Sequence, residues 1–177
     1  NEIVELVHNY VHPETGELIT KERLEIKGLG KAKYILKPGG TLGDLYTNSD
    51  LVYNDDGYIE VDKNGNVAVK DDYMDDIYLG SVFPKYNLAW RNDFNYKGIN
   101  LGVLFTARIG GICYSATQAN MDLYGVSEAS AAARDAGGVM INGRDMIDAQ
   151  KWYQVIGSQS GLPQYYTYSA TNVRLQE

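Results

Sequence analysis

The chain has little of what several large classes of protein require. Its single cysteine, Cys113, excludes an internal disulfide framework, and no apolar run reaches the ~18 residues of a transmembrane helix. Basic residues are in deficit, because 16 Lys and Arg stand against 23 Asp and Glu and give a net charge of -7. Nucleic acid is therefore not an expected partner, since neutralising phosphates requires a basic surface.

Phenylalanine is also scarce, with 3 residues against 15 tyrosines, whereas glycine is abundant at 19. This composition suits a dry core poorly, because each buried phenol needs a hydrogen-bond partner. Tyrosine with glycine and asparagine is typical of hydrated binding loops and of the aromatic girdles of membrane β-barrels. A length of 177 residues allows one domain or two small ones.

Turn and cap signals predict most of the short elements, and no internal repeat is apparent. Two short strands are expected in "ERLEIKG" and "AKYILKPGG", and a hairpin is expected around Asn64-Gly65. The acidic run at 71–76 is interpreted as solvated surface. Three short helices are expected in "ATQANMDLYG", in "EASAAARDAGG" after the cap Ser127, and in "AQKWYQVIG" after the cap Asp148.

The most informative segment is a pair of alternating runs around Lys97-Gly98. Each run has about 11 residues, which matches the ~9–11 residues of a tilted strand that crosses a bilayer. A turn at Lys97-Gly98 places Tyr96 opposite Ile99, Phe94 opposite Leu101 and Trp90 opposite Phe105. One face of this hairpin is then apolar with aromatic residues near its ends. The other face is charged or small, and it carries Arg91, Asp93 and Arg108.

Patterns for enzymatic or metal chemistry are weak. "GSQSG" has Gln159 where a nucleophile elbow requires serine, and "GLGKAK" lacks the third glycine of a dinucleotide loop. His8 and His12 are spaced so that zinc is conceivable, and Asp62 with its neighbours hints at calcium. Loop histidines and a plain turn explain the same residues more simply. We therefore expect a protein that is not an enzyme and that has no cofactor, with Cys113 inert.

Several segments together resemble one family. The stretch "GSVFPKYNLAWRNDFNYKGINLGVLFTARIGG", followed by "YGVSEASAAARDAGGV", "DAQKWYQVIG" and "YSATNVRLQE", resembles the late barrel region of SusC-like (RagA-like) TonB-dependent outer-membrane receptors. From residue 80 to 177 the resemblance is nearly continuous, and upstream only "NEIVEL" and "KPGGTLGDLY" fit. The resemblance implies a plugged antiparallel barrel of about 22 strands. Such receptors import oligosaccharides or peptides with a SusD-like surface lipoprotein, and a TonB complex supplies the energy.

On this resemblance the chain is expected to be mainly β with a few short helices, as a fragment of a transmembrane barrel. The chain then divides into the end of a barrel strand plus a long extracellular loop (1–82), a spanning hairpin (83–109), a second extracellular loop with short helices (110–164) and the start of the next strand (165–177). Plug and TonB box are expected in parts of the parent protein outside this sequence. Lys97-Gly98 is expected to face the periplasm, since short turns lie on that side.

The family resemblance also assigns candidate residues. Arg91, Asp93 and Arg108 are expected to face the barrel lumen, and the apolar face is expected to contact lipid in the outer membrane of a Gram-negative bacterium. Aromatic residues of the two loops are candidates for contact with a glycan, a peptide or the lipoprotein: Tyr46, Tyr53, Tyr58, Tyr114, Tyr124, Trp152 and Tyr153. For any one of them, packing that holds a loop together is the simpler role. The alternative is a soluble β-rich glycan-binding or adhesin-type module.

Overall fold

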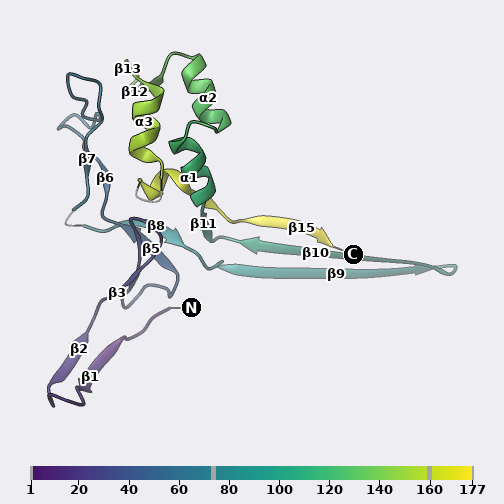
Figure 1. Cartoon of the computed structure of the whole chain (residues 1–177). Coiled ribbons are helices and arrows are strands. Elements are labelled where there is room, and N and C mark those ends of the chain that lie inside the picture. The colour runs from purple at the N-terminus through teal and green to yellow at the C-terminus, as the bar shows by residue number, and fades with distance from the viewer. Residues whose placement is uncertain (1, 73–74, 159–160, 177) are drawn as a thin grey trace.

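The computed structural model describes residues 2–72, 75–158 and 161–176. Of these residues, 43% are in strands and 16% in helices, so the chain is mainly β as the sequence predicts. Figure 1 shows a long arm of strands that projects from a lobe of short helices and small sheets. The loops on both sides of the arm gather at one end of it, and the tight turn forms the other end.

The arm is a three-stranded antiparallel sheet in the order β15-β10-β9, with β9 at Tyr86–Tyr96, β10 at Ile99–Ile109 and β15 at Asn172–Gln176. Lys97 and Gly98 join the first two strands, and both have positive φ (48° and 84°), as a two-residue type I′ turn requires. The pairs Tyr96 with Ile99, Phe94 with Leu101 and Trp90 with Phe105 confirm the predicted register.

The third strand of the arm, β15, follows β10 only after a long intervening segment of the chain. Residues 110–171 separate β10 from β15, yet β15 pairs antiparallel with the free edge of β10. Consecutive arm strands are therefore neighbours in the sheet, as in an up-and-down meander. Among the described residues no strand covers the outer edge of β9 or of β15, and no sheet closes on itself.

The three predicted helices are confirmed, and each begins at a side-chain cap. They are α1 (Ala116–Leu123), α2 (Glu128–Asp135) and α3 (Ala149–Ile156). Ser115, Ser127 and Asp148 each accept a hydrogen bond from a backbone N–H of the first turn, which satisfies one otherwise unpaired donor. Gly125 and Gly137 follow the first two helices with positive φ, the conformation that ends many helices.

Small sheets brace this helical lobe. Strand β11 (Ile112–Tyr114) pairs with β14 (Thr167–Ser169), and a 3-10 turn, η1 (Pro163–Tyr166), precedes β14. Strand β12 (Val139–Ile141) pairs with β13 (Asp145–Ile147) across Asn142-Gly143, both with positive φ. The β11–β14 pair joins the two ends of the 110–171 segment beside the arm.

The expected hairpin at Asn64-Gly65 is wrong in its details. The chain does reverse there, but Val61 and Val67 form only an isolated bridge, and Asn64 does not take the positive φ of a type I′ turn. The carboxylate of Asp62 instead accepts the N–H groups of Asn64 and Asn66, both at 2.8 Å. A side chain that mimics a turn carbonyl therefore sets the geometry.

The same turn occurs eight residues earlier, a repeat that was not predicted from the sequence. Asn54 Oδ1 accepts the N–H groups of Asp56 (3.0 Å) and Tyr58 (2.9 Å). In both turns a glycine, Gly57 or Gly65, occupies the third position after the Asx residue with positive φ. The segments "NDDGY" and "DKNGN" are thus two copies of one Asx-turn motif.

One hydrophobic core unites the two segments that were expected to be separate loops. Leu51 and Val67 from the first segment pack with residues of the second, and all of them are buried. The other members are Ala119, Ile141, Ile147, Trp152, Ile156 and Leu162 of the second segment, and Tyr166 just after it. Strands β6 (Asp50–Leu51) and β7 (Val69–Lys70) hold the first segment in place. The two segments therefore form one lobe.

The N-terminal half forms two further sheets. Strand β1 (Val7–Val11) pairs with β2 (Leu18–Lys21), and this hairpin lies away from the arm (Figure 1). A four-stranded sheet has the order β3-β4-β5-β8, with β3 at Leu24–Lys27, β4 at Ala32–Leu36, β5 at Asp44–Thr47 and β8 at Ile77–Ser81. Strands β3 and β4 are the two predicted in "ERLEIKG" and "AKYILKPGG".

The acidic run at 71–76 is mostly solvated, as expected, since Asp71, Asp72 and Asp75 are exposed, and the exception is Asp76. Asp76 is largely buried between Arg23 and Lys33 at 2.6 and 2.9 Å, and Asp71 pairs with Lys31 at 2.6 Å. The Lys31 ammonium lowers the pKa of Asp71 by hydrogen bonding to its charged form. These pairs tie the run to the four-stranded sheet.

Candidate functional site

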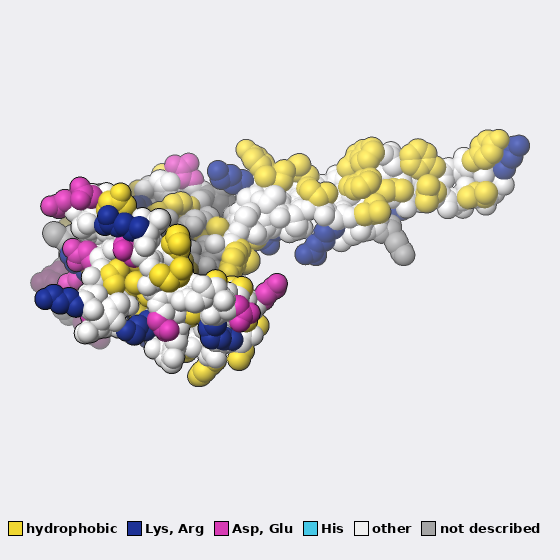
Figure 2. Space-filling model, turned by 90° about the horizontal axis from the view of Figure 1, so that it is seen from above, with side chains coloured by type: hydrophobic (Ala, Val, Ile, Leu, Met, Phe, Trp, Pro, Cys, Tyr) yellow, Lys and Arg dark blue, Asp and Glu magenta, His cyan; other side chains and the backbone are white. Residues whose placement is uncertain are grey.

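The apolar face of the arm carries a row of exposed hydrophobic side chains along its length. Trp90 is 61% exposed and Leu101 is 57% exposed, and Trp90 stacks on Phe105 with ring centroids 5.6 Å apart. Val173 and Leu175 of β15 lie on the same face, because they pair with Ala107 and Phe105. Figure 2 shows hydrophobic side chains gathered along one side of the arm. Soluble proteins rarely leave such a continuous apolar patch in water.

Aromatic residues stand at both ends of this face, as the sequence predicts. Tyr86 pairs with Ile109 at the end near the lobe, and Tyr96 pairs with Ile99 at the turn. Both phenols are exposed. A phenol whose ring is beside apolar residues and whose hydroxyl reaches water is suited to a boundary between the two environments.

The opposite face of the arm holds the three residues expected to line a lumen. Arg91 and Asp93 are neighbours on β9 and form a bidentate pair, with Nε to Oδ2 at 2.9 Å and Nη2 to Oδ1 at 3.1 Å. Arg108 of β10 lies farther toward the lobe, and its Nη2 donates to the carbonyl of Val82 at 2.9 Å. The structure thus places all three on the polar face, although Arg108 is apart from the other two.

A cavity of about 430 Å³ opens on this polar face near the lobe. Its wall includes polar side chains from all three arm strands. These are Asn87, Thr106, Arg108, Asn172, Arg174 and Gln176. The cavity has two guanidinium groups in its wall and no acidic residue among its described lining.

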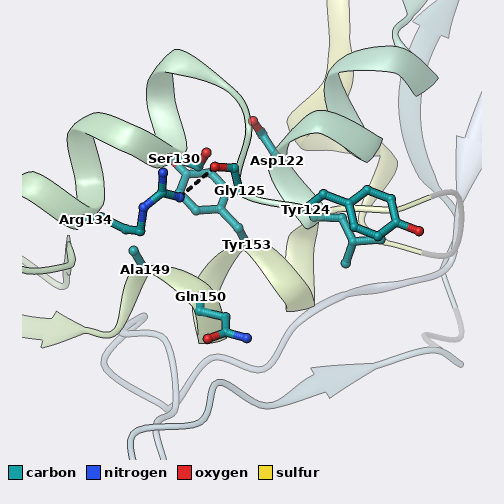
Figure 3. Close-up of a pocket in the computed structure, with 9 residues that line it drawn as sticks. Asp122, Tyr124, Gly125, Ser130, Arg134, Ala149, Gln150 and Tyr153 are labelled. Atoms are coloured by element: carbon teal, nitrogen blue, oxygen red, sulfur yellow. Dashed lines mark hydrogen bonds between the residues drawn. The ribbon is translucent and has the colours of Figure 1, made fainter.

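A second cavity, of about 230 Å³, lies among the three helices (Figure 3). Tyr124, at the end of α1, and Tyr153, on α3, both line it, so the structure brings two of the predicted aromatic residues together. Arg134 of α2 donates to the carbonyl of Gly125 at 2.7 Å and so fixes the end of α2 against the α1–α2 connection. Burial and the nearby Asp122 carboxylate raise the pKa of Tyr153.

An open groove of about 840 Å³ runs between the two Asx turns and the β12–β13 hairpin. Tyr58 lies in its wall beneath the guanidinium of Arg144, 5.1 Å from the ring centroid. The side-chain amide of Asn142 bonds both backbone groups of Ile59, accepting at 2.8 Å and donating at 3.0 Å. This amide takes the place of a strand partner and fastens the hairpin to the first segment.

The other predicted aromatic residues mainly hold the fold together. Tyr46 is 5% exposed in β5 and packs against Tyr78 at 5.1 Å. Trp152 is 8% exposed in the core of the lobe, where it meets Tyr165 edge-on at 5.9 Å. Tyr114 is half-buried against this core, and burial raises the pKa of its phenol.

Two of the seven aromatic candidates project most clearly into solvent beside a cavity or groove. Tyr124 is 77% exposed at the helix cavity, and Tyr58 is exposed at the groove. Tyr53 is also exposed and forms an isolated bridge with Ile59. Tyr58 and Tyr124 are therefore the better-placed candidates for contact with a ligand or partner.

Sequence reasoning missed four residues that shape these surfaces: Asn142, Arg134, Arg144 and Arg174. For Asn142 a signal was present, since the Asn-Gly dipeptide of "INGRD" lies between short apolar runs. Arg134 bonds Gly125 only nine residues before it. Arg144 meets Tyr58, and Arg174 approaches Arg108, across long stretches of chain, so no local signal indicates those two contacts.

Metal chemistry finds no support within the described part of the chain, where no group of three or more potential ligands converges. His12 uses Nδ1 to accept the N–H groups of Glu14 and Thr15 in the β1–β2 turn. The His8 side chain and Gln159 lie outside the described residues. Cys113 is exposed on β11.

Of the helices in the described ranges, none is long and apolar enough to cross a membrane. Comparison with protein-family models and with curated proteins finds no match for this chain.

Proposed function

We propose that the chain is part of a TonB-dependent outer-membrane transporter of the SusC-like class, one that imports oligosaccharides or peptides together with a SusD-like surface lipoprotein. The observation that carries the proposal is the amphipathic arm, which leaves one apolar face without any protein cover. In this proposal that face contacts the lipid of the outer membrane, and the polar face borders the lumen.

The free energy of solvation favours lipid on this face. Each apolar side chain that leaves water gains roughly 25 cal/mol per Å² of apolar surface. Eleven exposed apolar or aromatic side chains share this face. The strands are 11 residues long, and a tilted strand needs ~9–11 residues to cross the hydrocarbon layer. Tyrosines at both ends lie where aromatic girdles occur in barrels of this type.

The connectivity of the arm supports the same conclusion. Strands that follow one another along the chain are neighbours in the sheet, and two open edges remain for further strands. Outer-membrane barrels combine short periplasmic turns with long extracellular loops. The arm has a two-residue turn at one end and the whole lobe at the other (Figure 1).

In this proposal the lobe is extracellular. Its groove and its helix cavity carry Tyr58 and Tyr124 on the surface, where the SusD-like lipoprotein or an incoming substrate would contact them. The TonB complex would act through parts of the parent protein outside these residues. The proposal assigns no catalytic role to any residue.

The proposal is tested by asking which tryptophan touches lipid. The chain has two, Trp90 on the apolar face and Trp152 in the core of the lobe. The chain is reconstituted in vesicles that contain phosphatidylcholine with brominated acyl chains, since bromine quenches fluorescence only on contact. The Trp152→Phe variant, in which Trp90 is the only tryptophan, should be strongly quenched, whereas the Trp90→Phe variant should not.

A matched control probes the other face at the same depth. Thr106 neighbours Phe105 on β10 and points to the polar face. Thr106→Trp in a background that lacks both native tryptophans should escape quenching by the acyl chains. Equal quenching at positions 90 and 106, or none at 90, would overturn the lipid-facing assignment.

A soluble glycan-binding or adhesin-type module is the second candidate, and the open groove beside Tyr58 favours it. Carbohydrate sites combine an exposed aromatic ring with charged and amide side chains, and this groove has Glu60, Asp62 and Arg144 in addition to Tyr58. Sedimentation without detergent discriminates between the two candidates. A stable monomer in water would favour the soluble module, because the transporter fragment should self-associate through its apolar face and open edges.

A further inference from the structure

Two arginines on the polar face of the arm lie close together in the sheet. Arg108 pairs with Asn172, and Arg174 pairs with Thr106, so the two arginines are diagonal neighbours on adjacent strands. Diagonal positions on one face of a sheet are roughly 7–8 Å apart, within reach of long side chains that converge on one ligand. Both line the 430 Å³ cavity near the lobe, which is defined here as the arm cavity.

Neither of these guanidinium groups is neutralised by a described acidic residue. Arg108 gives Nη2 to the carbonyl of Val82, while its Nε is buried without a hydrogen-bond partner. Arg174 has no ion pair within the described ranges. By contrast Arg91, on the same face, is paired with Asp93.

This concentration of positive charge runs against the character of the chain, whose net charge is -7. Two like charges on adjacent strands destabilise the sheet unless an anion or water screens them. The rest of the wall adds Asn87, Asn172 and Gln176 as amide donors and Thr106 as a hydroxyl donor. These groups can hydrogen-bond an oxyanion without adding negative charge.

The helix cavity and the groove have a different chemistry. The helix cavity sets Asp122 against Arg134, and the groove sets Glu60, Asp62 and Asp145 against two basic residues. The arm cavity presents two arginines with no described acid in its wall. A pocket beside Lys27 and Lys31 also has no acid in its lining, but Lys31 is already paired with Asp71 at 2.6 Å.

We propose that the arm cavity binds the carboxylate of a small acidic solute, with Arg174 and Arg108 as its charged contacts. Guanidinium groups pair with carboxylates through two parallel N–H···O bonds, and such charge-assisted bonds are stronger than neutral ones. The inference rests on the proposed function only in making this solute a transported substrate, since the polar face would then border the lumen below the extracellular lobe. Carboxylates of this kind occur in acidic sugars and in acidic peptides.

The test measures binding by calorimetry to the full chain, held in a nonionic detergent that has no sugar head group. The first comparison is between trigalacturonate and neutral maltotriose, and the second is between triglutamate and triglutamine. The acidic ligand of at least one pair should bind with a dissociation constant of about 1 mM or lower, and more weakly as salt is raised. The pair that responds identifies the source of the carboxylate.

Variants locate the binding at the arm cavity. Arg174→Gln should weaken the acidic ligand about tenfold, the effect of losing one charge-assisted hydrogen bond. Arg91→Gln is the matched control and should leave the affinity unchanged. Arg91 lies on the same face, but Asp93 already neutralises its charge. Circular dichroism of both variants checks that the fold is retained.

The inference would be overturned if neither acidic ligand bound more tightly than its neutral counterpart, or if both variants weakened binding equally. Quenching of Trp90 by brominated lipid is measured separately and concerns the other face. If Trp90 is quenched but no carboxylate binds, only the proposed binding at the arm cavity is contradicted. If a carboxylate binds but Trp90 is not quenched, only the proposed transporter function is contradicted.

Discussion

Two Asn-Gly dipeptides in this chain show how a residue's surroundings decide what its local signal becomes. At Asn142-Gly143 both residues have positive φ and are the central residues of a turn in which the Arg144 N–H donates to the Ile141 carbonyl at 3.1 Å. At Asn64-Gly65 only the glycine has positive φ, because the Asp62 carboxylate already accepts a hydrogen bond from the N–H of Asn64. A hairpin was predicted at Asn64-Gly65 and not at Asn142-Gly143, whose flanking strands are only three residues long.

Asn142 has two separable roles, and substitutions distinguish them. Asn142→Gly keeps the positive φ but removes the amide that bonds both backbone groups of Ile59, and it should lower the free energy of unfolding by about 1–2 kcal/mol. Asn142→Ala also forces an alanine into positive φ and should cost about 1 kcal/mol more. Urea unfolding measures both. Equal costs for the two variants would show that the backbone conformation contributes nothing.

Asp62 should make its turn sensitive to acid. The N–H of Asn66, followed by its side-chain amide, lowers the pKa of Asp62 below its ordinary value of 3.8 by bonding to the charged form. Because the folded pKa is the lower one, the stabilisation is complete above 3.8 and is lost as pH falls through the folded pKa. The amide resonances of Asn64 and Asn66 should therefore shift with a midpoint below 3.8.

The Asp62→Asn variant provides the control for this titration. An asparagine keeps an oxygen acceptor for the two N–H groups but does not ionise, and Asn54 forms the same turn in the native chain. The acid shift should vanish in the variant while the turn remains. A midpoint at or above the ordinary value in the native chain would contradict the role given to these hydrogen bonds.

At the scale of elements, the arm follows its sequence closely. Its alternation, its two-residue turn and its register were all predictable, since each depends on residues within one hairpin. The helices were equally predictable, because a capping side chain and a terminal glycine act within one turn of each end. A C-terminal strand was expected, but its pairing with β10 across 110–171 was not predicted.

The turn of the arm offers a paired prediction. Gly98 has a φ of 84°, so Gly98→Ala should destabilise the turn by about 1 kcal/mol. Lys97 also has positive φ, which asparagine tolerates better, so Lys97→Asn should stabilise it by a few tenths to about 1 kcal/mol. Hydrogen exchange of the amides near the turn should speed up in the first variant and slow down in the second. Changes in the same direction would mean that the turn conformation is wrongly assigned.

At the scale of the whole molecule, the two long segments before and after the arm hairpin share one core. Leu51 of the first segment is fully buried among side chains of the second. Nothing in either segment alone indicates this contact, because each contributes only part of an apolar surface. Packing between distant segments therefore decides that the lobe is one body.

Truncation of Leu51 tests that shared core. Leu51→Ala should lower the free energy of unfolding by about 2–5 kcal/mol, since it leaves a cavity in a packed interior. It should also speed hydrogen exchange in α3, although α3 is about a hundred residues away along the chain. Leu42→Ala is the matched control, because Leu42 is exposed and its loss should be nearly neutral. Unchanged exchange in α3 would show that the segments fold independently.

The sequence by itself determined the elements whose causes are local. These are the alternating strands, the turn at Lys97-Gly98 and the three capped helices, each set by residues a few positions apart. Only the tertiary structure decided that Tyr46 and Trp152 are buried while Tyr124 is exposed, that Leu51 enters a distant core and that Arg174 lies diagonal to Arg108. Those outcomes depend on which surfaces meet after long stretches of chain close, and closure is governed by packing and register between segments, which no short window of sequence contains.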